Sequence, residues 1–374
     1  MNILCTNCKQ PYPHDSTPFR CPRCGGLFDY AGTLPYNPTN IEDDQPGIWR
    51  YRRSFDLPED AAPVSLGEGN TPLVWAPAFG QRVAFKCEYQ NPTGSFKDRG
   101  CAPIAAFLRQ RGVKIAVEDS SGNAGASFAA YAARAGIQAR VFIPDSASGP
   151  KRQQIEAYGA QVVRIMGSRT NATKAALRAI DKNGGSQGIL YESLPAYASH
   201  AYLPFNLPGY ATLAYELVEQ MEQSPGSVLV PVGQGGLLLG IGRGFESLRK
   251  AGIIAQVPRL VGVQARACAP LWAVYSYGQA GMSWAAEAPT LAEGIRVLQP
   301  LRGDAVLAAV NSSQGIFVAV DEENILPGRD ELARLGLYVE PTSAVVWDAL
   351  RQTIDCLPGP VAVVLTGSGL KSGA

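Results

Sequence analysis

The residues of this chain that could do chemistry begin with cysteines near the amino terminus. Cys5 and Cys8 are separated by two residues, as are Cys21 and Cys24, and twelve residues lie between the two pairs. Such pairs can complete a tetrahedron of thiolates around Zn²⁺, which leaves no coordination position for a substrate. The spacing therefore predicts a structural zinc ribbon. Two disulfides are the competing interpretation, which a reducing compartment disfavours.

A lysine with unusual surroundings follows in the run NPTGSFKDRG, residues 91–100. A helix expected over Phe96–Gln110 places Lys97 in its first turn. The positive end of the helix dipole lowers the pKa of an ammonium group there, which is unfavourable for a structural lysine and suits a reactive amine. A solvated lysine balanced by Asp98 is the alternative.

Two loops of small residues mark further strand-to-helix junctions. The run SSGNAGAS, residues 120–127, offers N–H groups at a helix start that suit a carboxylate, and Asn123 adds an amide. A good turn with an N-cap is the plainer interpretation. The run PVGQGGL, residues 231–237, is a glycine-rich loop whose N–H groups can converge on phosphate oxygens. It matches neither GxGxxG nor GxxxxGK[ST], so we expect a phosphate there but no nucleotide.

A fourth feature, LTGSGLK at residues 365–371, adds hydroxyl groups at the end of the last expected strand. A reactive lysine, a carboxylate cradle, a phosphate cradle and a hydroxyl donor describe a pyridoxal phosphate site. In such a site the lysine carries the cofactor, the glycine loop holds its phosphate and the hydroxyl meets the pyridine nitrogen.

The elements that must position these residues alternate along the chain from Pro63 onward. Nearly continuous apolar runs predict strands over Lys114–Val117, Gln138–Ile143, Gln161–Ile165, Ile189–Tyr191, Ser227–Val230, Leu260–Gln264 and Pro360–Leu365. Amphipathic or alanine-rich runs predict helices over Phe96–Gln110, Ala124–Ala135, Lys151–Tyr158, Ala172–Lys182, Thr212–Glu222 and Thr342–Thr353. This alternation predicts an α/β fold with parallel sheets covered by helices on both faces, in which ligands bind at the carboxyl ends of strands. Residues 25–60, rich in Pro, Gly, Asn and Asp, predict a connector with a short helix near Trp49–Phe55.

Composition excludes several other classes of protein. The chain has 374 residues, 33 Lys and Arg against 32 Asp and Glu, and two histidines. A net charge of +1 argues against a nucleic-acid or anionic-membrane surface, and no run approaches the roughly 20 apolar residues of a membrane span. Neither histidine lies in HExxH and no GxSxG is present, so zinc-protease and serine-hydrolase motifs are absent. We expect a cytoplasmic protein, because no secretory signal or transit peptide begins the chain.

Taken together, the motifs resemble those of threonine synthase and its relatives among the fold-type II, tryptophan synthase β-like, pyridoxal phosphate enzymes. GEGNTPL at residues 67–73, NPTGSFKDRG, SSGNAG and LTGSGLK match in order. The resemblance covers residue 63 to the carboxyl terminus, and a four-cysteine ribbon also occurs in a branch of threonine synthase-like proteins. It implies two open parallel-sheet domains with the cofactor between them. We accordingly expect a zinc ribbon at 1–30, a linker at 31–62 and a catalytic region at 63–374, whose smaller subdomain spans about 100–205.

The resemblance also implies roles for particular residues. Lys97 would be the Schiff-base lysine, which carries the α proton and later protons. Asn123 would hydrogen-bond the pyridine 3-hydroxyl, and Thr366 would face the pyridine nitrogen. The substrate carboxylate would be held by Ser121, Gly122, Asn123, Ala124 and Gly125. The cofactor phosphate would be held by Gly233, Gln234, Gly235, Gly236 and Leu237. The implied reaction converts O-phospho-L-homoserine and water into L-threonine and phosphate, and a homodimer is expected.

One stretch departs from the family pattern. Threonine synthases usually carry a segment like NPxRxxGQKT near the substrate phosphate, whereas residues 203–212 here read LPFNLPGYAT, without Arg, Gln or Lys. A phosphate dianion needs a cation nearby, for which Lys151, Arg152 and Arg296 are candidates. A related dehydratase or β-replacement enzyme acting on serine, threonine or an activated serine is therefore the alternative activity. A zinc-ribbon binding protein whose α/β part has lost catalysis is the alternative outside enzymes.

Overall fold

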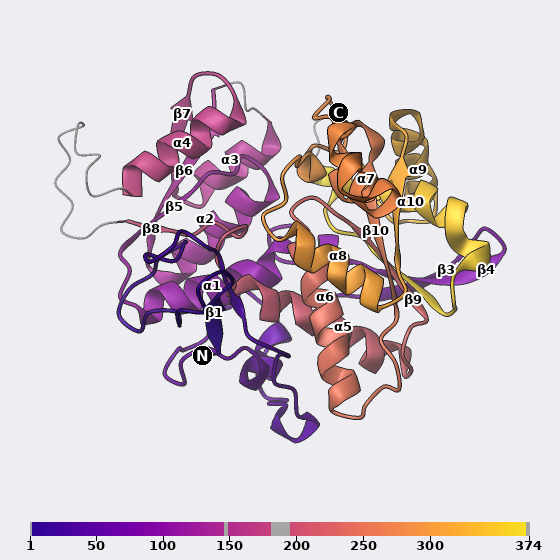
Figure 1. Cartoon of the computed structure of the whole chain (residues 1–374), viewed down its shortest axis with the longest axis horizontal. Helices are drawn as coiled ribbons and strands as arrows, with labels where there is room; N and C mark the ends of the chain where they lie inside the picture. The colour runs from indigo at the N-terminus through magenta and orange to yellow at the C-terminus, as the bar shows by residue number, and fades with distance from the viewer. Residues whose placement is uncertain (1, 146–148, 181–194, 372–374) are drawn as a thin grey trace. The chain divides into compact units, whose positions relative to one another are not determined.

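The computed structural model describes residues 2–145, 149–180 and 195–371 (Figure 1). It divides into two compact units. Unit 1 consists chiefly of Met1–Glu68 and Lys97–Gly209, and unit 2 of Gly69–Phe96 and Tyr210–Ser372. Each unit contains its own parallel sheet, so the α/β class predicted from the alternating pattern is confirmed.

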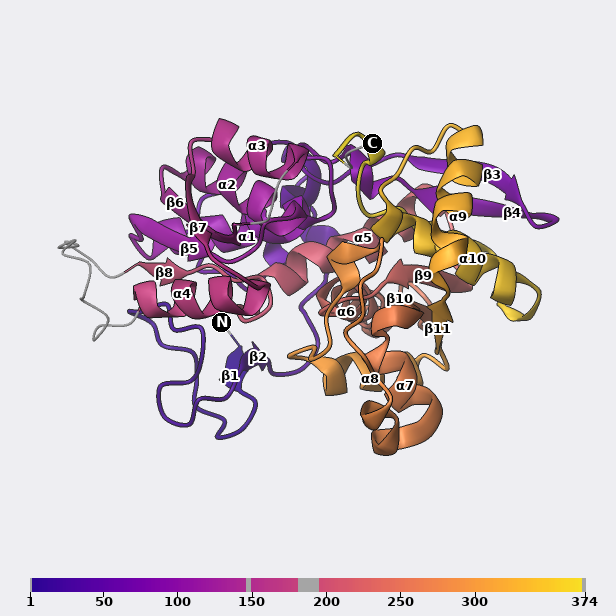
Figure 2. The ribbon, with the colours of Figure 1, turned by 90° about the horizontal axis from the view of Figure 1, so that it is seen from above.

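The sheet of unit 1 has the strand order β7-β6-β5-β8, and its described pairings are all parallel. Its strands are β5 (Ile115–Glu118), β6 (Gln138–Pro144), β7 (Gln161–Ile165) and β8 (Ala196–Tyr197). Its helices are α1 (Lys97–Gln110), α2 (Asn123–Ala135), α3 (Pro150–Ala157) and α4 (Arg169–Ile180). Figure 2 shows α4 on one face of this sheet and α1, α2 and α3 on the other. The sheet is therefore buried on both sides, which explains its apolar strands.

The amino-terminal part of unit 1 contains little regular structure. A short antiparallel pair joins β1 (Ile3–Cys5) to β2 (Phe28–Tyr30). Two 3₁₀ helices follow at Pro38–Asn40 and Gly47–Ser54, the second where a short helix was expected over Trp49–Phe55. Trp49 is buried there and donates a 2.7 Å hydrogen bond from Nε1 to Glu68 Oε1, which ties the connector to the rest of unit 1.

The sheet of unit 2 has the order β11-β10-β9-β12-β4-β3, in which only the β3–β4 pair is antiparallel. Its strands are β3 (Leu73–Ala78), β4 (Gln81–Lys86), β9 (Ser227–Pro231), β10 (Arg259–Ala265), β11 (Ile316–Val320) and β12 (Val361–Val364). Its helices are most of α5 (Asn206–Met221), then α6 (Gly236–Lys250), α7 (Pro270–Tyr277), α8 (Gly303–Ser312), α9 (Glu322–Arg334) and α10 (Pro341–Thr353). Figure 2 shows α9 and α10 on one face of this sheet and α6 and α8 on the other.

The structure differs from the sequence-based elements at a few places. The helix predicted over Thr212–Glu222 begins six residues earlier, at Asn206. Pro208 discouraged that extension, yet it lies in the first turn, where proline's missing N–H costs no helical hydrogen bond. The helix predicted over Ala172–Lys182 begins at Arg169, and the strand predicted at Ile189–Tyr191 lies outside the described residues. The elements that were not predicted are strands β1, β2, β3, β4, β8 and β11 and helices α7, α8 and α9.

Candidate active site

Lys97 is the first residue of α1, in the first turn as predicted. The loop that precedes it is anchored within unit 2: Phe96 donates from its N–H to Thr366 O at 3.0 Å, and Ser368 donates to Gly94 O at 3.0 Å. Ser95 forms an isolated bridge with Gly367. Backbone hydrogen bonds therefore hold the chain up to the residue before Lys97.

The predicted carboxylate loop leads from β5 into α2 in unit 1. Gly122 is the N-cap, so the N–H groups of the first turn of α2 have no partner within the helix. A Cβ at Gly125 would lie 1.9 Å from Ser120 O, so the loop can close this tightly only with glycine there. Unpaired N–H groups at the start of a helix are a general site for an anion.

The glycine-rich loop leads from β9 into α6 in unit 2, and its backbone has the shape of a phosphate cradle. Gly235 is the N-cap with φ of +81°, a conformation that favours glycine. A Cβ on Gly235 would lie 2.5 Å from a methyl group of Val306. Gln234 Oε1 accepts a 3.0 Å hydrogen bond from the N–H of Leu301, so the Gln234 side chain has a role within the fold.

Thr366 lies just after β12, also in unit 2, and is 2% exposed. Its N–H donates to Ser343 Oγ at 2.8 Å, but its hydroxyl oxygen Oγ1 has no hydrogen-bond partner among the residues that the structure describes. A buried hydroxyl without a partner carries a desolvation penalty of about 1–3 kcal/mol, which a ligand could remove. Together with the glycine-rich loop of the same unit, this hydroxyl fits pyridoxal phosphate.

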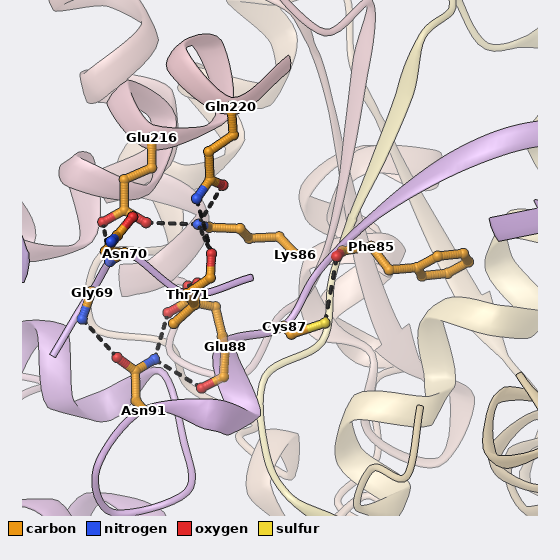
Figure 3. Close-up of polar contacts among 10 residues, drawn as sticks. All are labelled: Gly69, Asn70, Thr71, Phe85, Lys86, Cys87, Glu88, Asn91, Glu216 and Gln220. Carbon is orange, nitrogen blue, oxygen red and sulfur yellow. Dashed lines mark hydrogen bonds and ion pairs between the residues drawn. The ribbon is translucent and has the colours of Figure 1, made fainter. Parts of the chain in front are cut away.

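A buried polar cluster in unit 2 explains the GEGNTPL motif (Figure 3). The Lys86 ammonium, fully buried at the end of β4, donates to Glu216 Oε2 and Thr71 O at 2.7 Å and to Gln220 Oε1 at 2.8 Å. Glu216 Oε1 in turn accepts a 2.8 Å hydrogen bond from the N–H of Asn70. The ammonium thus has three acceptors, which makes Lys86 a structural lysine.

The same cluster extends to the start of the NPTGSFKDRG run. Asn91 Oδ1 accepts from the N–H of Gly69 at 2.9 Å, and Asn91 Nδ2 donates to Glu88 Oε2 at 2.9 Å. Glu88 Oε1 accepts from Thr71 Oγ1 at 2.6 Å. Residues 69–71 and the loop that leads to Lys97 are therefore fixed by one set of hydrogen bonds (Figure 3).

Like Lys86, Glu118 is a buried titratable residue that the sequence analysis did not single out, and it lies in unit 1. Glu118 ends β5, is 1% exposed, and its Oε1 lies 3.2 Å from Nδ1 of His200. Burial raises the pKa of Glu118 well above its usual value, Asp119 raises it further, and Lys97 and Arg169 lower it. A buried charged residue at the end of the apolar run IAVE was the signal available in the sequence.

The four amino-terminal cysteines lie together, as the spacing predicted. Their sulfur atoms are all within 4.8 Å of one another, with Cys5 and Cys24 at 3.4 Å and Cys8 and Cys21 at 3.6 Å. Zn–S bonds of about 2.3 Å in a tetrahedron require sulfur atoms roughly 3.8 Å apart. The cluster therefore has the dimensions of a Cys₄ zinc site.

The predicted substitutes for a substrate-phosphate ligand have other contacts. Arg296 lies 3.6 Å from the Glu287 carboxylate, and Arg152 lies 3.5 Å from Glu156 one turn along α3. Lys151 is half-buried on the same helix. Within 203–212, the side chains of Leu203, Phe205, Leu207 and Tyr210 are buried, so this segment serves packing.

Comparison with known proteins shows the family to which the chain belongs. The model of the pyridoxal-phosphate dependent enzyme family matches residues 64–367, and the chain belongs to this family, whose fold is the fold-type II α/β arrangement. Threonine synthase of Methanocaldococcus jannaschii is 31% identical over 98% of this chain and 92% of its own length. Threonine synthase of Synechocystis sp. is 35% identical over 87% of this chain and 82% of its own. Among solved structures, the threonine deaminase of T.th. is 28% identical, with a TM-score of 0.66 over 81% of this chain and 94% of that one.

Proposed function

We propose that this chain is a pyridoxal-phosphate dependent carbon–oxygen lyase of threonine synthase type, which converts O-phospho-L-homoserine and water into L-threonine and phosphate. The observation that carries this proposal is the similarity to threonine synthases over most of the chain, as with the Methanocaldococcus jannaschii protein over 98% of it. The lysine at the start of α1, the glycine cradle and the partnerless Thr366 hydroxyl support it.

Each site residue has a proposed task. When bound, pyridoxal phosphate supplies an electron sink for negative charge at the substrate α carbon. Lys97 Nζ holds the cofactor covalently and later accepts the α proton. The N–H groups of Gly233–Leu237 bind the cofactor phosphate, and Thr366 Oγ1 meets the ring nitrogen. Ser121–Gly125 hold the substrate carboxylate, and the Asn123 amide contacts the cofactor 3-hydroxyl.

Turnover of four amino acids tests the reaction. The cofactor-loaded protein is given O-phospho-L-homoserine, L-threonine, L-serine and O-phospho-L-serine, and phosphate and ammonia are measured separately. We expect phosphate from O-phospho-L-homoserine, with little ammonia from any of them. Ammonia without phosphate release would refute the threonine synthase assignment.

The Lys97→Ala variant tests the cofactor attachment. We expect the wild type to be yellow, and borohydride to reduce the chromophore to a stable adduct on the peptide containing residue 97. Lys97→Ala should lose that adduct, whereas Lys114→Ala, which changes an exposed lysine of unit 1, should retain it. An unchanged adduct in Lys97→Ala would remove Lys97 from the site.

A dehydratase or β-replacement enzyme is the second candidate, and one observation favours it. Residues 203–212 contain no cation, and their apolar side chains are buried in the fold. The similarity in fold to threonine deaminase is consistent with this alternative. It predicts turnover of an unphosphorylated amino acid to ammonia and an α-keto acid.

The cysteine cluster is proposed to hold structural zinc through Cys5, Cys8, Cys21 and Cys24. Protein prepared under reducing conditions should contain one tightly bound zinc per chain, measured by elemental analysis. Cys8→Ser should lower that stoichiometry, while Cys356→Ser, which changes an exposed cysteine far along the chain, should not. A zinc content near zero in the wild type would refute the site.

Three further expectations stay proposals. The chain is proposed to be organised as a ribbon at 1–30, a linker at 31–62 and a catalytic region at 63–374, with the smaller subdomain at about 100–205. It is proposed to be cytoplasmic. It is also proposed to be a homodimer, and light scattering of the purified protein would test the oligomeric state. No described helix is long and apolar enough to cross a membrane.

A further inference from the structure

The buried pair Glu118 and His200 has no place in the roles described so far. Glu118 ends β5, and three residues later the chain reaches the loop proposed to hold the substrate carboxylate. His200 follows β8, which pairs with β5 in parallel through Ala116–Ala196 and Val117–Tyr197. Both side chains therefore lie at the carboxyl ends of neighbouring parallel strands, the edge at which such sheets bind ligands.

The two side chains are held in different ways. Glu118 Oε1 lies 3.2 Å from His200 Nδ1, while Glu118 Oε2 is buried and has no hydrogen-bond partner among the residues that the structure describes. The backbone of His200 is itself fixed, because Asn206 Nδ2 donates to His200 O at 2.7 Å. One carboxyl oxygen is thus oriented by a histidine and the other is left for a ligand.

The charged surroundings favour a carboxyl group that exchanges protons. Lys97 from α1, Asp119 on the same loop and Arg169 from α4 all act electrostatically on Glu118, and Glu118 acts on the buried thiol of Cys101 in α1. Burial is the largest influence and raises the pKa of Glu118 well above its usual value. An acid with a raised pKa keeps its proton to a higher pH than usual, which suits a proton donor.

The proposed reaction needs such a group in addition to Lys97. The γ carbon of the substrate must gain a proton to become the methyl group of threonine, and the water that adds at the β carbon must lose one. We propose, building on the function proposed above, that Glu118 Oε2 gives its proton to the γ carbon and recovers one from the water, with His200 as its positioning residue.

The protons and electrons of these reaction steps balance. Lys97 first takes the α proton. Phosphate then leaves with the electrons of the γ carbon–oxygen bond and takes up the proton lost from the β carbon. The electrons of that β carbon–hydrogen bond form a β–γ double bond. A γ C–H bond then forms with the Glu118 proton, and the double bond moves between the α and β carbons. Water adds at the β carbon, its proton returns to Glu118 Oε2, and Lys97 returns its proton to the α carbon.

Glu118→Gln separates this role from a structural one. Without the acid, the substrate that has lost its phosphate can still take a proton from Lys97 at its α carbon. The product is then vinylglycine. We expect wild type to form one threonine per phosphate. In Glu118→Gln, threonine formation should fall by about 10²-fold or more, as expected for loss of a general acid–base, and vinylglycine should accompany the phosphate. A variant that is merely destabilised would form less threonine and less phosphate together, so that the ratio of threonine to phosphate stays at one.

The controls use the two histidines of the chain. His200→Asn should also lower the ratio of threonine to phosphate, whereas His14→Asn should leave it unchanged. Because only two histidines are present, NMR of labelled histidine in the holoenzyme, assigned with His14→Asn, follows the His200 titration directly. The His200 resonances should move in Glu118→Gln, because Glu118 Oε1 lies 3.2 Å from His200 Nδ1.

The outcomes are distinguishable. If wild type releases no phosphate from O-phospho-L-homoserine, the proposed function is wrong and this inference falls with it. If wild type gives one threonine per phosphate and Glu118→Gln does the same at an unchanged rate, the inference alone is wrong. If Glu118→Gln is inactive, the NMR spectrum decides, and unmoved His200 resonances overturn the pairing on which the inference rests.

Discussion

At the scale of single residues, two buried oxygen atoms are central to the proposed chemistry. Thr366 Oγ1 and Glu118 Oε2 are both buried without a hydrogen-bond partner in the described residues. The sequence predicted Thr366 through its motif but did not reveal Glu118. A motif carries information about neighbours along the chain, whereas the pairing of Glu118 with His200 depends on which strands become adjacent.

The Thr366 hydroxyl is expected to contribute directly to cofactor affinity. Thr366→Val keeps the shape of the side chain and removes the hydroxyl, so pyridoxal phosphate should bind about fivefold more weakly, since a hydrogen bond contributes roughly 1 kcal/mol. Equilibrium titration followed by the chromophore measures this. Thr353→Val is the matched control, because that hydroxyl donates to Ala349 O within the last turn of α10. Equal affinities for wild type and Thr366→Val would contradict the assigned contact.

The raised pKa of Glu118 also predicts how stability depends on pH. The folded chain holds the Glu118 proton more tightly than the unfolded chain does, so this group lowers the free energy of unfolding as the pH rises above about 4.3, its unfolded value. Glu118→Gln removes this contribution. Urea unfolding between pH 4 and 8 should therefore show a smaller loss of stability with rising pH in the variant than in wild type, and parallel curves would contradict the burial argument.

At the scale of elements, the buried ion pair between Lys86 and Glu216 joins β4 to α5. The same two side chains hydrogen-bond the backbone of Asn70 and Thr71 and so order residues 69–71. Lys86→Met alone leaves the Glu216 carboxylate buried without its partner, which typically costs about 3–5 kcal/mol of unfolding free energy. The double variant Lys86→Met with Glu216→Leu should recover much of that loss. Arg249 and Glu246 on α6, 2.7 Å apart and accessible to solvent, give the control pair, because an ion pair in contact with solvent contributes little to stability. Urea unfolding of these variants measures the difference, and a Lys86→Met cost no larger than that of Arg249→Met would contradict it.

The sequence predicted several elements with nearly the limits that the structure has. Strand β7 matches its predicted limits, and α1 and α2 begin within one residue of theirs. Strand β11 was missed because a short apolar run such as IFVAV does not distinguish a buried strand from a buried helical segment. The start of α5 was missed because Pro208 resembles a helix breaker until its first-turn position is known.

At the scale of the whole molecule, the chain divides its proposed site residues between two compact units. Lys97 and residues 121–125 belong to unit 1, whereas Gly233–Leu237 and Thr366 belong to unit 2. The sequence predicted the α/β class and the site motifs, because each lies at a strand-to-helix junction. It did not predict that Gly69–Phe96 would join the carboxyl-terminal part of the chain, since that depends on the pairing of β4 with β12.

The most direct test of this account is the stoichiometry of a single reaction. Purified, cofactor-loaded protein is incubated with O-phospho-L-homoserine, and inorganic phosphate and L-threonine are quantified over time. We predict that both appear at the same rate, with one threonine for each phosphate and no matching release of ammonia. No phosphate release, together with ammonia formed from L-threonine or L-serine, would contradict the assignment and identify a dehydratase.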